Sequence, residues 1–319
     1  MKVLVTGATG LVGSSIVAVC REKGYEVNYL TTRREKIKNE VGYRGFFWNP
    51  AKGEMDTACL EGVQMVINLA GASISQRWTA TNRKVILDSR IDSLRTLRKG
   101  MGAAGHTVTS VVSASAIGIY PSSLEKFYEE DAPGVDNSFL GEVVEAWEKE
   151  ADTLALPGVK VAKVRIGLVM SANGGALPEM ARPIKYFAGA AFGHGNQWQS
   201  WIHVKDLARM FLFIGENALD GVYNGVAPNP VTNSKLVKKI AEVLSKPLFL
   251  PNVPKAIMQL VLGDMSYILF ASQRVSSKKI EEEGFVFDHY NICSALNEIY
   301  GKADASKPVK TDLDREFIS

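Results

Sequence analysis

Short apolar runs alternate with amphipathic segments along the first 170 residues of the chain. The amphipathic segments repeat apolar residues at helical spacing, which predicts helices packed on one face. The apolar runs are rich in β-branched residues and predict buried strands. Strands that alternate with helices indicate an α/β fold with a doubly wound parallel sheet and helices on both faces. The predicted strands are 2–7, 25–32, 44–50, 63–71, 109–118 and 159–171, and the predicted helices are 11–24, 82–101 and 137–152.

The pattern changes after residue 171. A segment rich in turn-forming residues is followed by amphipathic helical segments at 204–219 and 233–246. We expect a nucleotide-binding domain over 1–171, with a returning segment near 200–228. We also expect a smaller, mixed but mostly helical substrate lobe over 172–301, which includes a helical C-terminal segment at 251–301. The polar residues 302–319 predict a mobile tail.

Composition and charge narrow the class of protein. The chain has 319 residues, 46% of them hydrophobic, and a formal net charge of +3. This small excess of positive charge gives no reason to expect nucleic acid as a partner. The apolar stretch at 256–271 is interrupted by Gly263 and Asp264, so we expect no membrane span. The first strand starts too early for a signal peptide, and we expect a cytoplasmic protein.

The cysteines and histidines suggest no metal centre. Cys20, Cys59 and Cys293 lie far apart in apolar or mixed segments, so we expect them to be buried as small hydrophobic residues and not paired as disulfides. The four histidines show no metal-ligand spacing.

A glycine-rich turn joins the first predicted strand to the first helix. It reads Gly7-Ala8-Thr9-Gly10-Leu11-Val12-Gly13. Gly7 would permit the tight turn, Gly10 would let the backbone approach a pyrophosphate, and Gly13 would let the helix pack closely on the sheet. The helix N-terminus then offers N–H donors to the phosphates. The pattern predicts a dinucleotide site of the Rossmann type; a turn needed only for packing is the alternative. The predicted contacts are Gly7, Thr9, Gly10, Leu11, Val12 and Gly13.

The end of the second strand distinguishes between the two nicotinamide cofactors. An NAD site usually carries an Asp or Glu there, which binds the ribose 2′-hydroxyl. This chain has Thr31-Thr32-Arg33-Arg34 instead, and no carboxylate until Glu35. A guanidinium can bind a 2′-phosphate through charge-assisted hydrogen bonds. The sequence therefore favours NADP(H) over NAD(H), with Thr32, Arg33 and Arg34 at the phosphate; an ordinary solvated arginine pair is the alternative.

These features resemble the extended short-chain dehydrogenase/reductase superfamily in its atypical form. The resemblance continues in "NLAG" (68–71), "SASAIGIY" (113–120), "VRIGLVMS" (164–171) and "WIHVKDLA" (201–208). More narrowly, the chain is similar to the sugar-nucleotide-epimerase-like subfamily. That closer similarity rests on Arg77-Trp78, "DSRID" (88–92), "AWEKEA" (146–151), "GGA" (174–176), "NGVAPNPVTN" (224–233) and the helical C-terminal segment.

The resemblance implies roles for further residues. It places Leu69, Ala70 and Gly71 along the cofactor. It places Ser113, Ala114 and Ser115 beside the nicotinamide, and Arg165 toward the cleft between cofactor and substrate. It makes Arg77, Trp78, Trp201 and His203 candidates for the substrate side. Structural alternatives remain open: Arg165 could be a buried arginine satisfied by carbonyls, Trp201 a core residue, and His203 the residue that positions a helix start.

The resemblance also implies a catalytic Tyr-x-x-x-Lys pair on the helix after "SASAIGIY". A phenol with a pKa near 10 needs a nearby cation to act as a base at neutral pH. Here the tyrosine position falls at Phe139 or Leu140, and the lysine position at Val143 or Val144. The usual proton relay is therefore absent. Ser115 and, after it, Tyr120 are the candidates to replace it.

Three functions remain open from the sequence. The first is an NADP-dependent oxidoreductase or epimerase-like enzyme, which acts on a small carbonyl, alcohol or nucleotide-sugar-like substrate without the standard pair. The second is a catalytically silent NADPH sensor or protein-interaction module. The third is an NAD-dependent nucleotide-sugar epimerase. A homodimer is compatible with each of them.

Overall fold

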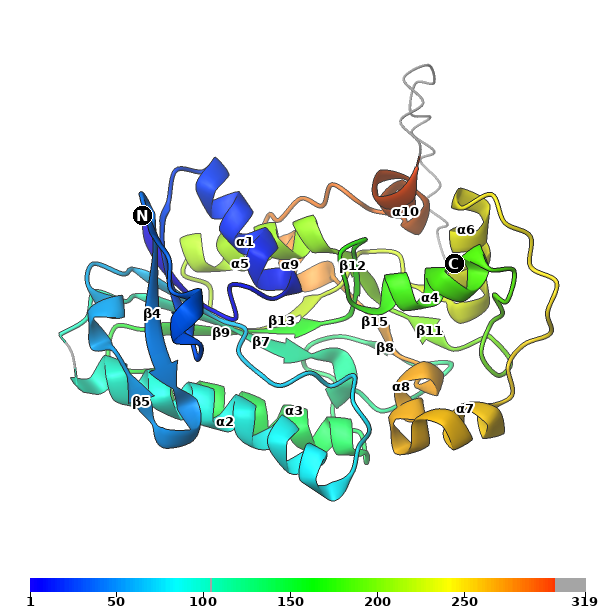
Figure 1. Ribbon diagram of the computed structural model, residues 1–319, viewed down its shortest axis with the longest axis horizontal. Coiled ribbons are helices and arrows are strands. Elements are labelled where there is room, and N and C mark those ends of the chain that lie inside the picture. The colour runs from blue at the N-terminus through cyan, green and yellow to red at the C-terminus, as the bar shows by residue number, and fades with distance from the viewer. Residues whose placement is uncertain (104, 302–319) are drawn as a thin grey trace, which may run out of the picture.

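The computed structural model describes residues 1–103 and 105–301, so the predicted mobile tail at 302–319 lies outside the described residues. A sheet of nine strands forms the centre of the molecule (Figure 1). Its strand order is β13-β9-β7-β6-β1-β2-β4-β3, with β5 paired to β4. All neighbours from β13 to β4 are parallel, whereas β3 and β5 pair antiparallel with β4. The strands of this sheet are β1 (Lys2–Thr6), β2 (Glu26–Thr31), β3 (Asn39–Glu40), β4 (Tyr43–Asn49), β5 (Glu54–Met55), β6 (Met65–Asn68), β7 (Ser110–Ala116), β9 (Lys160–Ile166) and β13 (Gly221–Gly225).

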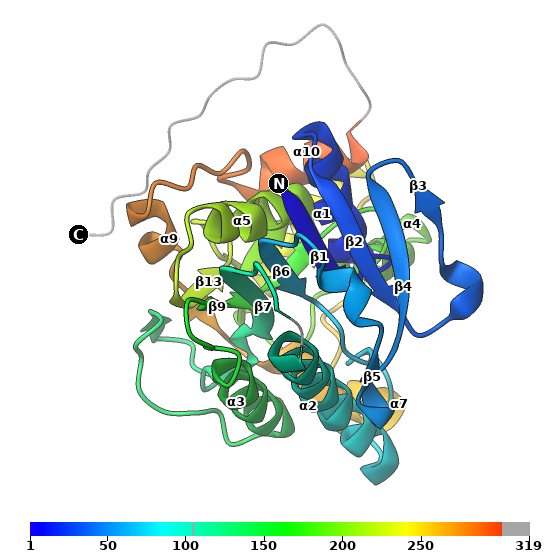
Figure 2. The same cartoon turned by 90° about the vertical axis from the view of Figure 1, so that its left-hand side faces the viewer.

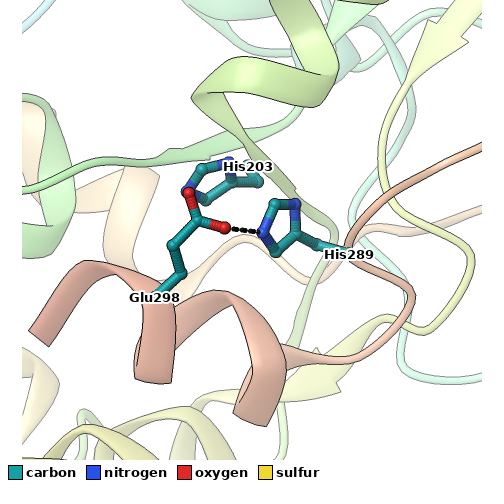
Figure 3. Close-up of side chains that lie close together, drawn as sticks. All are labelled: His203, His289 and Glu298. Atoms are coloured by element: carbon teal, nitrogen blue, oxygen red, sulfur yellow. Dashed lines mark hydrogen bonds and ion pairs between the residues drawn. The ribbon is translucent and has the colours of Figure 1, made fainter. Parts of the chain in front are cut away.

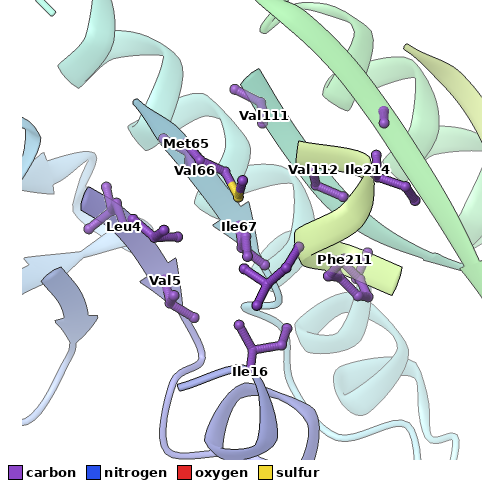
Figure 4. Packing of buried hydrophobic residues seen from close by; sticks show 14 of the residues in the cluster. Leu4, Val5, Ile16, Met65, Val66, Ile67, Val111, Val112, Phe211 and Ile214 are labelled. Carbon is purple, nitrogen blue, oxygen red and sulfur yellow. The ribbon is translucent and has the colours of Figure 1, made fainter. Parts of the chain in front are cut away.

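Helices cover both faces of this sheet, which confirms the predicted doubly wound α/β architecture. α1 (Leu11–Glu22) and α5 (Val204–Glu216) lie on one face, and α2 (Ala80–Ala103) and α3 (Phe139–Asp152) on the other (Figure 2). Burying both faces explains why the central strands read as continuous apolar runs. Figure 4 shows the core on the first face, where Ile16 of α1 and Phe211 of α5 pack against the central strands.

The predicted strand at 159–171 is divided at Gly167. β9 ends at Ile166 in the main sheet, and β10 (Leu168–Met170) pairs instead with β12 (Trp201–His203). A Cβ atom at Gly167 would lie 2.4 Å from the carbonyl oxygen of Ser200. The chain therefore crosses another backbone at a point where only glycine fits, and it leaves the main sheet there.

Other elements between residues 168 and 300 form a second, mainly helical group beside the sheet. Leu177 of α4, Leu236 of α6 and Leu296 of α10 belong to one core that is separate from the main core. Short strands connect the helices of this region. The remaining elements are β8 (Phe127–Tyr128), α4 (Ala176–Lys185), β11 (Trp198–Gln199), β14 (Val231–Thr232), α6 (Asn233–Val243), α7 (Lys255–Leu262), α8 (Tyr267–Phe270), β15 (Arg274–Val275), α9 (Lys278–Glu282) and α10 (Ile292–Tyr300). Within the described residues, no helix combines the length and the apolar character that a membrane crossing requires.

Candidate cofactor and substrate site

The glycine-rich turn lies between β1 and α1, as predicted. Gly7 has a φ of +68°, in the left-handed region that favours glycine. A Cβ atom at Gly13 would lie 2.2 Å from the carbonyl oxygen of Gly7, so α1 can approach the turn only without a side chain there. Gly10 is the N-cap residue of α1, and within residues 1–103 and 105–301 no side chain accepts a hydrogen bond from the first helical N–H groups. A helix start of this kind offers its N–H groups to an anion.

A chain of buried polar groups fixes the neighbouring loop, which follows β6. The Thr6 hydroxyl donates to Asn68 Oδ1 (2.8 Å) and accepts the backbone N–H groups of Leu69 and Ala70 (both 3.0 Å). The Asn68 amide donates in turn to the Ser113 hydroxyl (3.3 Å) on β7. Ser113, predicted beside the nicotinamide, is fully buried and takes part in this cross-strand chain.

The next part of the loop is held by α2. Ser89 accepts the backbone N–H of Ala72 (2.9 Å), and the Arg90 guanidinium donates to the carbonyl oxygen of Ala72 (3.2 Å). Burial lowers the pKa of Arg90 to about 10. Gly71 is exposed beside this arginine, where a Cβ atom would lie 3.3 Å from the Arg90 side chain. The "DSRID" segment thus positions the loop on which Leu69, Ala70 and Gly71 are predicted to meet the cofactor.

The residues predicted to bind a 2′-phosphate lie at the end of β2. Thr32, Arg33 and Arg34 are all exposed. The guanidinium carbon of Arg34 lies 4.0 Å from the centre of the Phe47 ring, a cation–π contact that orients its side chain. Among the described residues, Arg33 forms no ion pair.

Helix α3 carries apolar residues where the superfamily resemblance implies a tyrosine and a lysine. Ser138 caps its start by accepting the N–H of Gly141 (3.4 Å). The Phe139 ring packs edge-on against Trp78, with 5.2 Å between ring centres. Val143 and Val144 are buried. The predicted helix is confirmed, and its first two turns serve packing.

The two candidate substitutes, Ser115 and Tyr120, belong to a buried network around one ion pair. Arg165 donates through Nε to Glu148 Oε1 (2.8 Å) and through Nη2 to Oε2 (2.9 Å), so the pair is bidentate. The Ser115 hydroxyl donates to the same Glu148 Oε1 (2.6 Å), and Arg165 Nη1 donates to the Tyr120 hydroxyl (2.9 Å). The Arg165 and Glu148 side chains are only 9% and 10% exposed.

This network extends to the returning strand β13. The Tyr120 hydroxyl donates to Asn224 Oδ1 (2.7 Å), and Arg165 Nη1 also donates to the carbonyl oxygen of Glu130 (3.1 Å). Burial raises the pKa of Tyr120 to about 12 despite the nearby guanidinium. The guanidinium of Arg165 donates mainly to a carboxylate, whereas the structural alternative assumed that only carbonyl groups accept its hydrogen bonds. All the hydrogen bonds of its side chain go to this network, and its predicted place toward the cleft stays a prediction.

A cavity of about 350 Å³ opens at the first turn of α3. Aromatic side chains form one wall, and the Arg83 guanidinium lies 4.9 Å from the centre of the Phe139 ring. Arg83 also pairs with Asp264 (2.7 Å), which ties α2 to the C-terminal helical segment. The cavity is lined by Trp78, Arg83, Ser138, Phe139, Lys255, Gln259, Gly263, Asp264, Ser266 and Tyr267.

Tyr267 brings a phenol to this cavity from α8. Its hydroxyl donates to Asp136 Oδ2 (2.7 Å), two residues before the N-cap of α3. Burial and the Asp136 carboxylate raise the pKa of Tyr267, so the phenol is protonated at neutral pH. Tyr267 could not be singled out from the sequence, because it lies in a distant apolar segment and reaches α3 only through the fold.

The four predicted substrate-side residues do not lie together. Trp78 lines the cavity, and the neighbouring Arg77 is exposed. Trp201 is fully buried in the C-terminal core, and its indole N–H donates to the carbonyl oxygen of Asn229 (2.8 Å). His203 is the N-cap residue of α5, and its Nδ1 accepts the N–H of Lys205 (3.3 Å). The structure thus gives Trp201 and His203 the packing and helix-start roles that were their alternatives.

His203 also belongs to a second polar cluster, with His289 and Glu298 (Figure 3). The two imidazole rings lie 4.0 Å apart at 31°. His289 Nδ1 bonds to Asp206 (2.9 Å) and its Nε2 bonds to Glu298, which also accepts from Lys205 Nζ (2.6 Å). Both nitrogens of His289 are thereby held by carboxylates, and the cluster fastens α10 to α5.

The protonation states of this cluster follow from its contacts. Burial and the neighbouring His289 lower the pKa of His203 to about 4. Burial alone would lower the pKa of His289, but its hydrogen bonds to Asp206 and Glu298 raise it. For Glu298, burial acts to raise the pKa, yet the hydrogen bonds from Lys205 and His289 outweigh it and lower the value to about 2.

Glu298→Gln should change how stability depends on pH. The depressed pKa of Glu298 stabilises the folded state above the unfolded value of about 4.3, and that stabilisation is lost as the pH falls toward 2. We expect the variant to melt below the wild type at pH 6, with a difference that shrinks from about pH 4 downward. Melting temperatures across this range measure it. Glu145→Gln, at an exposed carboxylate of α3, is the control; equal shifts in both variants would contradict the prediction.

Comparison with known proteins agrees with this architecture. Residues 3–225 match the NAD dependent epimerase/dehydratase family, and residues 253–299 match a domain of unknown function, DUF1731. The epimerase family protein YfhF of Bacillus subtilis is 36% identical over 94% of this chain and 98% of its own.

Solved structures give the same picture. The human epimerase family protein SDR39U1, crystallised with NADPH, superposes with a TM-score of 0.83 at 30% identity, over 94% of this chain and 99% of that one. MoeE5, in complex with UDP-glucose and NAD, shares the fold with a TM-score of 0.74 at 20% identity, over 94% of this chain and 97% of its own. The extent of these matches and the nucleotide-binding architecture of the sheet lead to one conclusion: the chain belongs to the NAD dependent epimerase/dehydratase family and carries a DUF1731 domain at its C-terminal end.

Proposed function

We propose that this protein binds NADP(H) in preference to NAD(H) and transfers a hydride to or from a small carbonyl or alcohol. The observation that carries the proposal is the end of β2. There, Thr32, Arg33 and Arg34 are exposed, and no carboxylate lies between Glu26 and Glu35 in the sequence. A relative of 30% identity that was crystallised with NADPH supports it, whereas MoeE5 was crystallised with NAD.

The residues around the turn fit a dinucleotide. The uncapped start of α1 would bind the pyrophosphate through backbone N–H groups, and Gly7 and Gly13 leave the space that such an approach needs. The Thr6 hydroxyl holds the loop after β6 along the predicted path of the cofactor. When bound, the nicotinamide supplies the hydride, and the protein supplies position and surroundings.

The cavity beside α3 is the proposed substrate site. Trp78 and Phe139 form an apolar wall that would exclude water from a bound carbonyl compound. Tyr267 is the protonated phenol of this wall and can hold a proton beside the substrate oxygen, in the region where the family resemblance implies a tyrosine. Ser115 and Tyr120 would act by holding β7 and β13 in register through Glu148 and Arg165.

Arg33→Ala tests the cofactor preference. We expect wild-type protein to bind NADPH more tightly than NADH in a calorimetric titration. Loss of the guanidinium should weaken the affinity for NADPH about 10- to 100-fold, because a hydrogen bond to a charged group contributes about 1.5–3 kcal/mol. Affinity for NADH should stay within about twofold. Tight binding of NADH with no preference for NADPH would overturn the proposal and favour an NAD-dependent nucleotide-sugar epimerase.

A second candidate is a silent NADPH sensor or protein-interaction module, favoured by the apolar residues on α3. Oxidation of NADPH, followed by absorbance across a panel of carbonyl compounds and nucleotide sugars, separates the two. Turnover that falls in Trp78→Ala while NADPH affinity is kept would support the enzyme. Binding without any turnover, together with an NADPH-dependent protein partner, would support the sensor. A homodimer stays a prediction.

A further inference from the structure

One buried hydroxyl holds the segment that follows β2. Tyr29 is only 1% exposed, yet its hydroxyl lies against the backbone of residues 36–38. It donates to the carbonyl oxygen of Lys36 (2.7 Å) and accepts the N–H of Lys38 (2.7 Å). Both peptide groups belong to an otherwise exposed stretch of chain. The Tyr29 hydroxyl anchors this stretch to the sheet, together with the N–H of Gly45, which donates to the carbonyl oxygen of Lys38 (2.9 Å).

The path of the Tyr29 ring depends on a glycine in the neighbouring strand. Tyr29 on β2 lies opposite Gly45 on β4. A Cβ atom at Gly45 would lie 2.6 Å from both the hydroxyl oxygen and the Cζ atom of Tyr29. Tyr43, two residues earlier on β4, stacks on the same ring with 4.4 Å between centres and 17° between planes. Because Gly45 has no side chain, the Tyr29 ring can cross β4 there. The stacked ring of Tyr43 supports the Tyr29 ring in this position.

The anchored segment carries the arginines proposed to recognise the 2′-phosphate. The N–H of Arg33 donates to the Thr31 hydroxyl (3.2 Å), and its carbonyl oxygen accepts the N–H of Lys36 (3.0 Å). The carbonyl oxygen of Arg34 accepts the N–H of Ile37 (3.1 Å). The turn at 33–36 is therefore fixed at one end by β2 and at the other by residues 36–38, the stretch that Tyr29 holds.

The same stretch faces the glycine-rich turn across a cavity of about 560 Å³. Thr9 of that turn lines the cavity on one side, and Tyr29, Lys36 and Lys38 line it on the other. Movement of residues 36–38 would therefore alter the space beside the proposed nucleotide site as well as the position of the arginines.

We infer that Tyr29 is a positioning residue for cofactor selectivity, which holds the 33–38 segment so that its arginines are preorganised for a 2′-phosphate. The inference rests on the proposed NADP(H) binding. An exposed arginine loses side-chain and backbone freedom when it binds a phosphate, and a loop already fixed in place loses less. NADH, which has no 2′-phosphate, gains nothing from that preorganisation. Tyr29 should therefore affect the two cofactors unequally.

Tyr29→Phe tests the inference, because it removes the hydroxyl and keeps the ring. We expect the affinity for NADPH, measured by calorimetry, to fall about tenfold while the affinity for NADH stays within about twofold, since both hydrogen bonds of the hydroxyl are lost. Tyr43→Phe is the matched control: it removes a hydroxyl from the stacked partner ring, and that hydroxyl makes no hydrogen bond among the described residues. Gly45→Ala, which displaces the Tyr29 ring, should lower the NADPH-to-NADH affinity ratio as Tyr29→Phe does.

The outcomes separate this inference from the proposed function. A wild-type preference for NADPH that is unchanged in Tyr29→Phe would overturn the inference and leave the function standing. An equal loss of affinity for NADPH and NADH in Tyr29→Phe would also overturn the inference, because a general loss of structure affects both cofactors alike. Wild-type protein that binds neither cofactor, or shows no preference, would instead refute the proposed NADP(H) function.

Discussion

Replacing Glu148 by alanine will lower the free energy of unfolding by about 3–5 kcal/mol, because it leaves a buried charge without its partner. Arg165 is 9% exposed at its side chain and gives two N–H groups to that carboxylate. The substitution has a further cost, because the Ser115 hydroxyl also loses its hydrogen-bond acceptor. Denaturant unfolding at pH 7, followed by circular dichroism, measures the change.

An exposed ion pair of the same sheet provides the control. Lys160 and Asp220 lie 2.8 Å apart, with side chains 57% and 59% exposed. Asp220→Asn should cost no more than about 1 kcal/mol. In addition, Glu148→Leu combined with Arg165→Met should recover most of the loss, because apolar residues of similar volume avoid the unpaired charge. If Glu148→Ala cost as little as Asp220→Asn, the network would not hold β7 and β9 as described.

The fold could be predicted because its signals are local. The parallel strands β1, β2, β4, β6, β7 and β9 each overlap a run that the sequence predicts as a strand, and the glycine turn marks where β1 passes into α1. The break at Gly167 could not be predicted, since its cause is the carbonyl oxygen of Ser200, which only the fold brings close. Short strands such as β11 and β14 contain two residues each, too few to show a period.

The same distinction between local and distant contacts separates the parts of the candidate site that could be predicted from those that could not. The glycine turn and the arginines after β2 are contiguous in sequence, so their chemistry could be read directly. The hydroxyl of Tyr267, the Glu148–Arg165 pair and the anchor of Tyr29 depend on contacts between distant segments. Trp201 shows the opposite error. Its place in a family motif suggested a substrate contact, but the fold buries its side chain completely in the core.

Gly10→Ala and Gly13→Ala should separate the two uses of glycine in the turn. At Gly13 a methyl group would lie 2.2 Å from the carbonyl oxygen of Gly7, so α1 must move. We expect that variant to lose about 1–3 kcal/mol of stability through overpacking. At Gly10 the nearest atom would be 3.2 Å away and the backbone is extended (φ −79°, ψ 177°), so alanine should change stability by less than about 1 kcal/mol.

The effect of Gly10→Ala on NADPH affinity should be large, although its effect on stability is small. A methyl group at Gly10 would stand where the pyrophosphate approaches the backbone, and the loss of two charge-assisted hydrogen bonds corresponds to about 100-fold or more in NADPH affinity. Calorimetry on folded Gly10→Ala protein measures this directly, and an unchanged melting temperature shows that the loss is not one of structure. If Gly10→Ala bound NADPH like the wild type, the start of α1 would not be the pyrophosphate site. Gly13 would then serve only the close packing of α1 on the turn.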